Sequence, residues 1–290
     1  MSAQDAARHA SPSTHLGRLT RFAAPATRAM ESFGQALLFV GQVLYLLPVT
    51  LRHYRRETFA RMNSLAWGRG SILVDGGVIS VLVILGISIG ASIAIEAFAV
   101  LNLLGFGALS GIVGGLANVR EMSPLVAGIA FAAQAGCRMT AEIGSMRIAE
   151  EIDAVEAMGL RAIPFVVGTR LIGGLTLVVP GFLLTLLVSF FVSNTMIKVF
   201  YDQPGGTYDH YFVQFLSPTD LFYSVVKAAA FCAAVTIIHC YYGYFASGGP
   251  AGVGLASGRA VRASLVAIMV IDFLLTVALW GLKPNFVFKG

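Results

Sequence analysis

The sequence predicts an all-α integral membrane protein, because the chain is strongly apolar, carries few charges and contains long runs without a charged residue. Of its 290 residues, 57% are hydrophobic and only 12% are charged, against roughly 25% charged in soluble domains. A membrane-spanning helix needs about 20 apolar residues. Runs of at least that length predict five transmembrane helices, at about 72–104, 122–146, 163–197, 221–246 and 263–282.

The segment before the first predicted span is expected to lie on the membrane rather than in it. We interpret 1–30 as a cytoplasmic N-terminal tail, 31–68 as the region of an amphipathic interfacial helix, and 69–290 as the membrane domain. Within 35–51 the sequence is apolar, but glutamines and a proline interrupt it and arginines flank both ends. Basic flanks at both ends favour an interfacial helix over a sixth span.

A second ambiguous segment, 101–119, is rich in glycine and too short to leave and return as a helix. We expect a broken or re-entrant piece on the outer side, enclosed by protein. Elsewhere, pairs such as Gly86 with Gly90 predict close packing of helices through small residues. Cys137, Cys232 and Cys240 lie in or beside apolar helices, so we interpret them as packing residues rather than a disulfide framework.

The distribution of arginine predicts the orientation. Short loops rich in Lys and Arg stay in the cytoplasm, and residues 1–69 hold nine arginines. Arg138, Arg147 and Arg161 flank the loop after the second span. The bias favours an N-terminus in the cytoplasm and a C-terminus outside, and it places the acidic stretch at 137–159 in the cytoplasm. The early arginines and the lack of an apolar run in the first thirty residues argue against a cleavable signal.

An acidic stretch at 137–159 stands out because it holds five of the fifteen carboxylates. Projected on a helix, Ile148, Ile152, Val155 and Gly159 form a narrow stripe, while the acids point elsewhere. A solvated loop helix is one interpretation. The other is a short amphipathic cytoplasmic helix that docks a separate ATPase.

The sequence offers no catalytic machinery. The five histidines are dispersed, and no metal-binding spacing occurs. The glycine-rich 248–254 lacks the lysine that a phosphate loop requires, and there is no basic stripe suited to nucleic acid. We therefore expect that the chain is not an enzyme and has no catalytic residue, metal or cofactor of its own; an intramembrane hydrolase that uses scattered residues is a minor alternative. ATP and Mg would be bound by a partner.

Charges inside the predicted spans are costly, about 2.5–3.5 kcal/mol at mid-bilayer. Glu96, Arg170 and Asp272 are such residues. Each is either part of a structural ion pair between helices or a functional group facing a cavity. In the functional interpretation Glu96 lies beside a polar lipid head, and Arg120 and Glu121 guard the same opening.

Several motifs resemble one family. The sequence AEIGSMRIAEEIDAVEAMG at 141–159 resembles the signature of the MlaE/YrbE permeases. Arg120-Glu121-x-x-Pro124 resembles that family's R-E-x-x-P, Gly243-Tyr244 followed by GPAGVG resembles its loop before the last span, and Asp272-Phe273-x-x-Thr276 resembles its closing D-F-x-x-T. The resemblance covers about 35–282.

The resemblance implies a permease subunit of an ATP-driven Mce-type ABC transporter that moves lipids across the envelope. It implies a cytoplasmic ATPase dimer docked on 149–160, an outer Mce-domain assembly, expected to be a hexamer, and a lipid pocket between two permease subunits. The coupling helix would comprise Ala149, Glu150, Glu151, Ile152, Asp153, Ala154, Val155, Glu156, Met158 and Gly159. The pocket would include Ile93, Val100, Leu101 and Leu104, to which the charge argument adds Glu96, Arg120 and Glu121.

One departure from the family pattern affects the expected assembly. Ala133-Gln134-Ala135-Gly136-Cys137-Arg138 resembles the B-type YrbE half of actinobacterial Mce systems, which pairs with an A-type half. A heterodimer is therefore expected. Two other functions stay open: an ion-coupled secondary carrier using Glu96 and Asp272, and a scaffold that assembles the outer Mce proteins. The cargo, whether fatty acid, phospholipid, mycolic acid or sterol, is left open by the sequence.

Overall fold

The computed structural model describes residues 14–68, 76–203 and 205–281, and these residues confirm an all-α membrane protein. They contain no β-strand, and a single antiparallel bridge joins Gly68 to Gly76. The chain divides into two compact units, Met1–Tyr45 and Leu46–Gly290. The helix α1, Thr14–His53, begins in the first unit and ends in the second.

The part of α1 over Gly34–His53 is long and apolar enough to cross a membrane. This segment contains 35–51, for which we predicted an interfacial position because of its basic flanks. Length and composition thus allow both positions, and the interfacial assignment stays a prediction.

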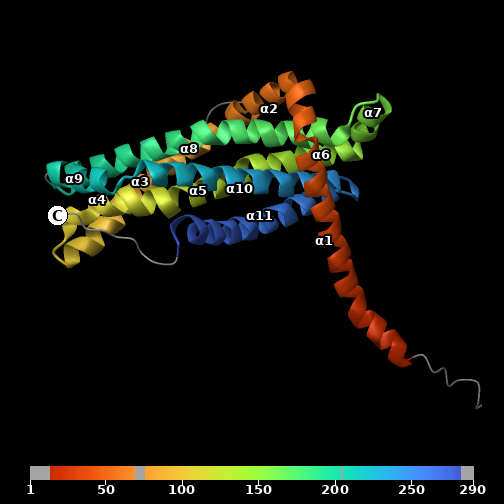
Figure 1. Ribbon diagram of the computed structural model, residues 1–290, viewed down its shortest axis with the longest axis horizontal. Coiled ribbons are helices and arrows are strands. Elements are labelled where there is room, and N and C mark those ends of the chain that lie inside the picture. Colours follow the sequence, from red (N-terminus) through yellow and green to blue (C-terminus); the bar gives the residue numbers. More distant parts are fainter. Residues whose placement is uncertain (1–13, 69–75, 204, 282–290) are drawn as a thin grey trace, which may run out of the picture. The chain divides into compact units, whose positions relative to one another are not determined.

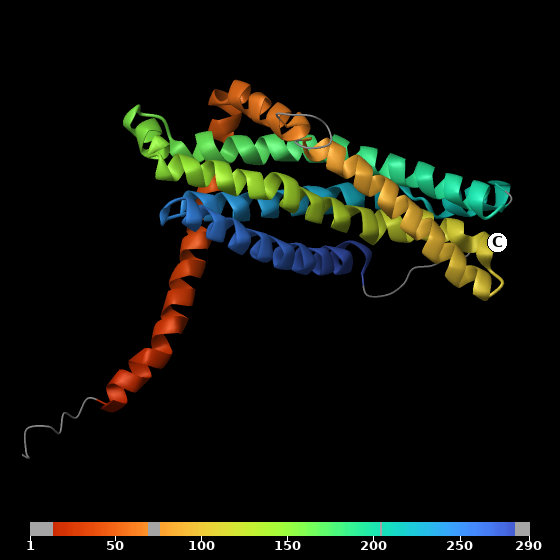
Figure 2. The same cartoon turned by 180° about the vertical axis from the view of Figure 1, so that it is seen from behind.

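The second unit is a bundle of long helices (Figures 1 and 2). After α2, Arg55–Trp67, come α3, Val78–Leu103, and the short α7, Glu151–Ala157. Next come α8, Thr169–Thr195, extended by π-helical turns to Pro164–Phe200, and α9, Gly205–Phe215. The last two helices are α10, Pro218–Tyr244, and α11, Gly249–Trp280. In both views α7 lies at one end of this bundle and α9 at the other.

Four of the five predicted spans are confirmed as helices long and apolar enough to cross a membrane: α3, Pro164–Phe200, α10 and α11. Their ends differ from the predicted ones. The last helix begins at Gly249 instead of residue 263, because the glycine-rich segment 249–254 forms its first turns, with proline near its start.

The predicted second span, 122–146, lies inside a longer helical stretch, Ser110–Ile148. This stretch consists of α4, Ser110–Ile112, α5, Ser123–Phe131, and α6, Cys137–Ile148, joined by π-helical turns at Val113–Met122 and Ala132–Gly136. It is not one of the five helices in the described residues that are long and apolar enough to cross a membrane. Its membrane crossing stays a prediction.

Of the two forms expected for 101–119, a broken or a re-entrant piece, the structure has the broken one. The chain breaks only briefly after α3, at a turn through Gly105, and a short 3₁₀ turn at Gly107–Leu109 leads into the helix that begins at Ser110. The glycines of 111–115 serve packing instead. A Cβ on Gly111 would lie 3.0 Å from the backbone nitrogen of Phe212, so glycine lets α9 approach closely.

Close helix packing through Gly86 and Gly90 is confirmed. Both glycines of α3 face the backbone of α8, where a Cβ on Gly86 would lie 2.8 Å from the carbonyl oxygen of Thr185, and one on Gly90 would collide with that of Ser189. Cys232 and Cys240 are fully buried, as expected of packing residues, whereas Cys137 is partly exposed; all three are free thiols.

Candidate functional site: coupling helix and charge clusters

A helix is found in the segment predicted to couple to an ATPase, but it is shorter than expected, and its coupling role stays a prediction. It is α7, Glu151–Ala157, so Ala149 and Glu150 precede it and Met158 and Gly159 follow it. Glu150 has a left-handed backbone (φ 57°), which separates α7 from α6. Gly159 adopts φ 79°, a conformation that suits glycine and ends the helix.

The amphipathic character of α7 is confirmed in part. Ile152 and Val155 are buried, while Glu151, Asp153 and Glu156 are exposed. Ile148 and Gly159, which we placed on the same stripe, are exposed. The left-handed residue at 150 breaks the helical phase between Ile148 and Ile152, so the apolar stripe does not continue across it.

The acidic side of α7 leaves several carboxylates available. The guanidinium of Arg147, on α6, donates to Asp153 Oδ1 at 2.8 Å and lies 6.0 Å from the centre of the Tyr244 ring. Within the described residues, Glu151 and Glu156 form no ion pair. The helix α7 thus has exposed acids on one side and two buried apolar side chains, Ile152 and Val155, on the other.

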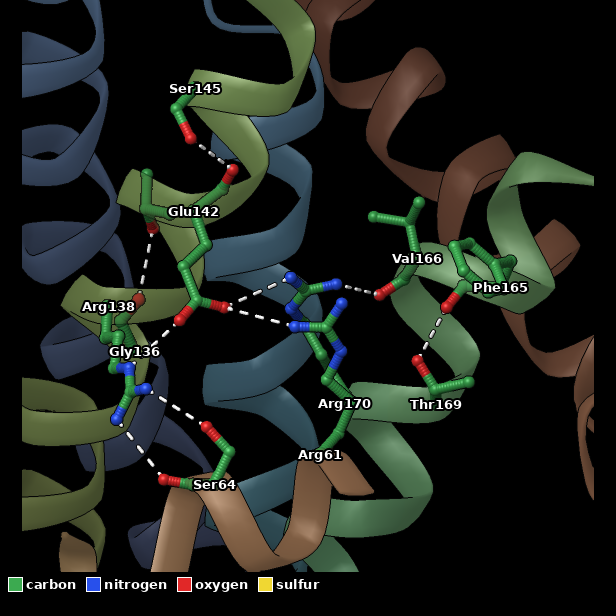
Figure 3. Close-up of polar contacts among 11 residues, drawn as sticks. Arg61, Ser64, Gly136, Arg138, Glu142, Ser145, Phe165, Val166, Thr169 and Arg170 are labelled. Atoms are coloured by element: carbon green, nitrogen blue, oxygen red, sulfur yellow. Dashed lines mark hydrogen bonds and ion pairs between the residues drawn. The ribbon is translucent and has the colours of Figure 1, made fainter. Parts of the chain in front are cut away.

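A cluster around Glu142, which we call the Glu142 hub, lies where α2, α6 and α8 meet (Figure 3). Glu142 Oε1 accepts from Arg138 Nε at 2.9 Å, and its Oε2 accepts from Arg170 Nη2 at 3.2 Å. Arg61 Nη1 lies 3.8 Å from the same Oε2. Arg138 also donates to the carbonyl and hydroxyl oxygens of Ser64. The hub comprises Arg61, Ser64, Arg138, Glu142 and Arg170.

Arg170 is the buried member of the hub, with 2% of its surface exposed. Its Nη1 donates to the carbonyl oxygen of Val166 at 2.7 Å, which satisfies a second edge of the guanidinium. Of the two interpretations of Arg170, the structural ion pair is therefore the one found.

A second cluster, the Lys227 network, joins the π-helical turns before α5 to α10 and α11. The Lys227 side chain is fully buried. Its Nζ donates to Glu121 Oε2, Thr276 Oγ1 and the carbonyl oxygen of Arg120 at 2.9–3.0 Å, and lies 2.7 Å from Asp272 Oδ1. Thr276 Oγ1 donates to Glu121 Oε1 at 2.9 Å. Asp272 is thus also a member of an ion pair between helices.

The network extends through Arg120 to the end of α11. Arg120 Nη2 donates to Asp220 Oδ2 at 3.0 Å, and Trp280 Nε1 donates to Asp220 Oδ1 at 2.6 Å. The Arg120 guanidinium lies 5.4 Å from the centre of the Trp280 ring, within the range of a cation–π contact. The Lys227 network comprises Arg120, Glu121, Asp220, Lys227, Asp272, Thr276 and Trp280.

Sequence reasoning missed Lys227, the centre of this network. The signal was present: a lysine inside the apolar run 221–246 must pair with an acid to be tolerated in the membrane. Arg120 and Glu121 make their contacts with α10 and α11, in this network, and no contact to Glu96 is found in the described residues. Their role in a lipid pocket stays a prediction.

The other predicted pocket residues lie on or just after α3. Ile93 is buried, Leu101 is partly exposed, and Glu96, Val100 and Leu104 are exposed at intervals of four residues along one face. In the described part of the chain Glu96 has no ion-pair partner. This face of α3 therefore presents an acid beside apolar side chains that no described residue of the chain covers.

Gln134, the residue that departs from the family pattern, has a structural contact. Its Nε2 donates to the carbonyl oxygen of Gly76 at 2.7 Å, next to the start of α3. Among the described residues, no group of three or more His, Cys, Asp or Glu side chains is arranged to hold a metal ion.

Comparison with known proteins assigns the chain to a family. The family model Permease MlaE matches residues 71–278. A protein of Rickettsia bellii named probable ABC transporter permease protein is 32% identical over 162 residues, which cover 56% of this chain and 62% of the relative. The protein TRIGALACTOSYLDIACYLGLYCEROL 1, chloroplastic, of Arabidopsis thaliana is 29% identical over 196 residues, 65% of this chain and 54% of the relative. The chain thus spans less than two thirds of the length of these curated relatives.

Proposed function

Because the chain belongs to the MlaE permease family, we propose that it is the membrane-spanning subunit of an ATP-driven lipid transporter. The name of the Rickettsia relative supports an ABC transporter, and the name of the Arabidopsis relative contains that of a glycolipid. The observation that carries the proposal is α7, a short helix with a buried apolar base and exposed acids at one end of the helix bundle.

In this proposal a separate cytoplasmic ATPase, with its own ATP and Mg, docks on α7. Such an ATPase can move the permease only if the helix on which it docks is held rigidly to the rest of the chain. Ile152 and Val155 fix α7 to the bundle, while Glu151 and Glu156 remain available to basic groups of a partner. Movement of α7 would be transmitted along α6 to the Glu142 hub, because Arg138 and Glu142 both lie on α6.

Charge reversal on α7 tests the docking. Glu151→Arg combined with Glu156→Arg changes two acids that form no described ion pair and leaves Ile152, Val155 and the Arg147–Asp153 pair intact. We expect the ATPase to be lost on co-purification while the permease still inserts in the membrane. Glu57→Arg, at an exposed acid of α2, is the control and should retain the ATPase. Undiminished co-purification of the double variant would refute the docking.

The exposed face of α3 is the proposed cargo site. We place it in a pocket between this chain and a second permease subunit, an A-type half in a heterodimer, with an outer Mce-domain assembly receiving or delivering the lipid. The N-terminus and α7 would face the cytoplasm and α9 the outer side of the inner membrane. An apolar face with one acid, Glu96, suits acyl chains beside a polar head.

Lipid crosslinking tests the pocket. Leu101→Trp adds a bulky side chain beside Val100 and Leu104, and we expect it to reduce lipid crosslinking to the assembled complex. Phe191→Trp, at an exposed position of α8, is the matched control and should crosslink normally. Normal crosslinking in Leu101→Trp would place the cargo elsewhere, and complex formation without any bound lipid would favour the scaffold function.

The ion-coupled carrier has less support. It required Asp272 to be available for a transported ion, but Asp272 lies 2.7 Å from the buried ammonium of Lys227. A carrier would continue to transport without the ATPase and would stop when the proton gradient is dissipated. The lipid transporter is expected to behave in the opposite way.

A further inference from the structure

The outer side of α2 carries two aromatic side chains that the chain itself does not cover. Phe59 and Trp67 lie two helical turns apart and are exposed to 67% and 63%, with the exposed amide side chain of Asn63 between them. The opposite side of α2 packs on α8, where a Cβ on Gly173 would lie 3.3 Å from the backbone of Met62. Figure 2 shows α2 lying against the outside of α8. A helix that is anchored on one side and presents aromatic and polar side chains on the other suits the membrane interface.

A groove adjoins this face of α2. Its volume is about 390 Å³, and it lies between the end of α2 and the first two turns of α3. Ala66, Trp67, Gly77, Ile79, Val83 and Ile84 line it, and Ser80 is the one hydroxyl residue of the lining. This volume falls within the range of small-ligand sites, and the lining suits a hydrocarbon chain rather than a polar molecule.

A surplus of positive charge lies in the Glu142 hub, whose Arg61 is one to two helical turns along α2 from the groove. The Glu142 hub has three guanidinium groups and one carboxylate, a formal surplus of two positive charges. Arg138 and Arg170 use their donors on Glu142, Ser64 and Val166. Arg61 is different, since its one described contact is 3.8 Å from Glu142 and 31% of its side chain is exposed.

The groove and the hub are physically connected. Gly76, which lines the groove, accepts from Gln134, and Gln134 lies one helical turn before Arg138. On α2, Arg61 lies one to two turns before Ala66 and Trp67, the first residues of the groove lining. The exposed guanidinium and the apolar groove are therefore close enough to be occupied by the two ends of one amphipathic molecule.

We propose that α2, the groove and Arg61 bind an anionic phospholipid of the cytoplasmic leaflet, with an acyl chain in the groove and the phosphate at Arg61. The site is separate from the cargo face of α3, which carries an acid and begins nine residues beyond the last groove residue of α3, Ile93 after Ile84. The proposal rests on the proposed orientation, which places α2 at the cytoplasmic side, where anionic lipids attract basic residues.

The test uses the full chain purified in detergent, with phosphatidylglycerol and phosphatidylcholine of identical acyl chains as probes and native mass spectrometry as the readout. We expect preferential retention of phosphatidylglycerol. Arg61→Gln should lower it roughly fivefold, the loss expected for one basic residue at an anionic surface. Ile84→Trp, which fills the groove, should lower retention of both lipids. Arg259→Gln, at an exposed arginine of α11, is the control and should change neither.

Equal retention of the two lipids, or equal behaviour of Arg61→Gln and Arg259→Gln, would overturn the proposal. Inorganic phosphate that displaces the phospholipid would show an anion site without lipid specificity, and would also overturn it. Leu101→Trp separates this site from the cargo site: retained phosphatidylglycerol in that variant supports a separate site, whereas its loss would show that the bound lipid is cargo. Gel filtration confirms that each variant is folded.

Discussion

The Glu142 hub and the Lys227 network both hold a charged side chain among packed helices, but the central charge is negative in the hub and positive in the network. The hub places one carboxylate among three guanidinium groups, and two of those arginines keep about a quarter or more of their side chain exposed. The network places one fully buried ammonium between two carboxylates, with a second pair, Arg120 and Asp220, beside it. In the network Lys227 is fully buried and Asp272 is 17% exposed, although Glu121 keeps 41% of its side chain exposed. Because the central charge of the network is buried, whereas the central carboxylate of the hub is 27% exposed, we expect the hub to tolerate substitution better than the network.

The largest effect is expected at the centre of the network. Lys227→Met removes the buried ammonium and leaves Asp272, 17% exposed, and Glu121, 41% exposed, without their counter-charge. We expect a loss of about 3 kcal/mol in the free energy of unfolding, the lower end of the range for a broken buried pair, because Glu121 is partly solvated. Thermal unfolding in detergent measures it. Lys198→Met is the control, because its pair with Asp209 is partly exposed on both sides and should contribute at most about 1 kcal/mol. Equal stability of the two variants would show that the network is not insulated from solvent.

Neutralising Glu142, the carboxylate of the hub, should lower the free energy of unfolding by a smaller amount. Glu142→Gln keeps one acceptor oxygen, Arg138 keeps Ser64, and Arg170 keeps the carbonyl of Val166. We expect a loss of about 1–3 kcal/mol in the same unfolding experiment, the range for unsatisfied buried donors. Glu57→Gln, on the exposed side of α2, provides the baseline. If Glu142→Gln is as damaging as Lys227→Met, then solvent access does not distinguish the two clusters.

The hydroxyl of Thr276 tests whether hydrogen bonds within the network contribute beyond charge. Thr276→Val keeps the shape of the side chain but removes an acceptor for Lys227 and a donor for Glu121. We expect a loss of about 1–2 kcal/mol. Thr176→Val is matched to it, since Thr176 is exposed on α8 and bonds only the carbonyl of Ile172 in the described structure. If Thr276→Val leaves the free energy of unfolding unchanged, the contribution of the network to stability comes from its charges alone.

The smallest loss of stability is expected at Arg61, the most exposed arginine of the hub. Arg61 lies 3.8 Å from Glu142 with its side chain partly exposed, so Arg61→Gln should change stability by at most about 1 kcal/mol. Arg170→Gln, at the buried arginine of the same hub, serves as the contrast and should cost more. A large loss in Arg61→Gln would mean that all three arginines share the pairing equally.

The helices could be predicted from the sequence because each apolar run is a local property. Four of the five predicted spans are helices able to cross a membrane, and the acidic stretch does contain a short amphipathic helix. The extent of α7 could not be predicted, because the left-handed residue at 150 is occupied by glutamate, which carries no signal of a helix break.

The partner of each buried charge could not be predicted from the sequence. Asp272 lies 45 residues from Lys227, and Glu121 lies 106 residues from it, so neither partner is visible in a local window. Arg170 and Asp272 therefore looked isolated, and only the packing of helices shows that both are paired. Of Glu96, Arg170 and Asp272, the three span charges named from the sequence, Glu96 alone stays without a described partner, which makes it the remaining candidate for a functional acid.

The burial of two of the three cysteines has a practical consequence for spectroscopy. Cys232 and Cys240 are closed to thiol reagents in the folded chain, and Cys137 is partly exposed. Replacing Cys137 alone should give a protein without background labelling. A single cysteine introduced at Met158, exposed directly after α7, would then carry a fluorophore or spin label that reports whether this helix moves when the proposed ATPase hydrolyses ATP.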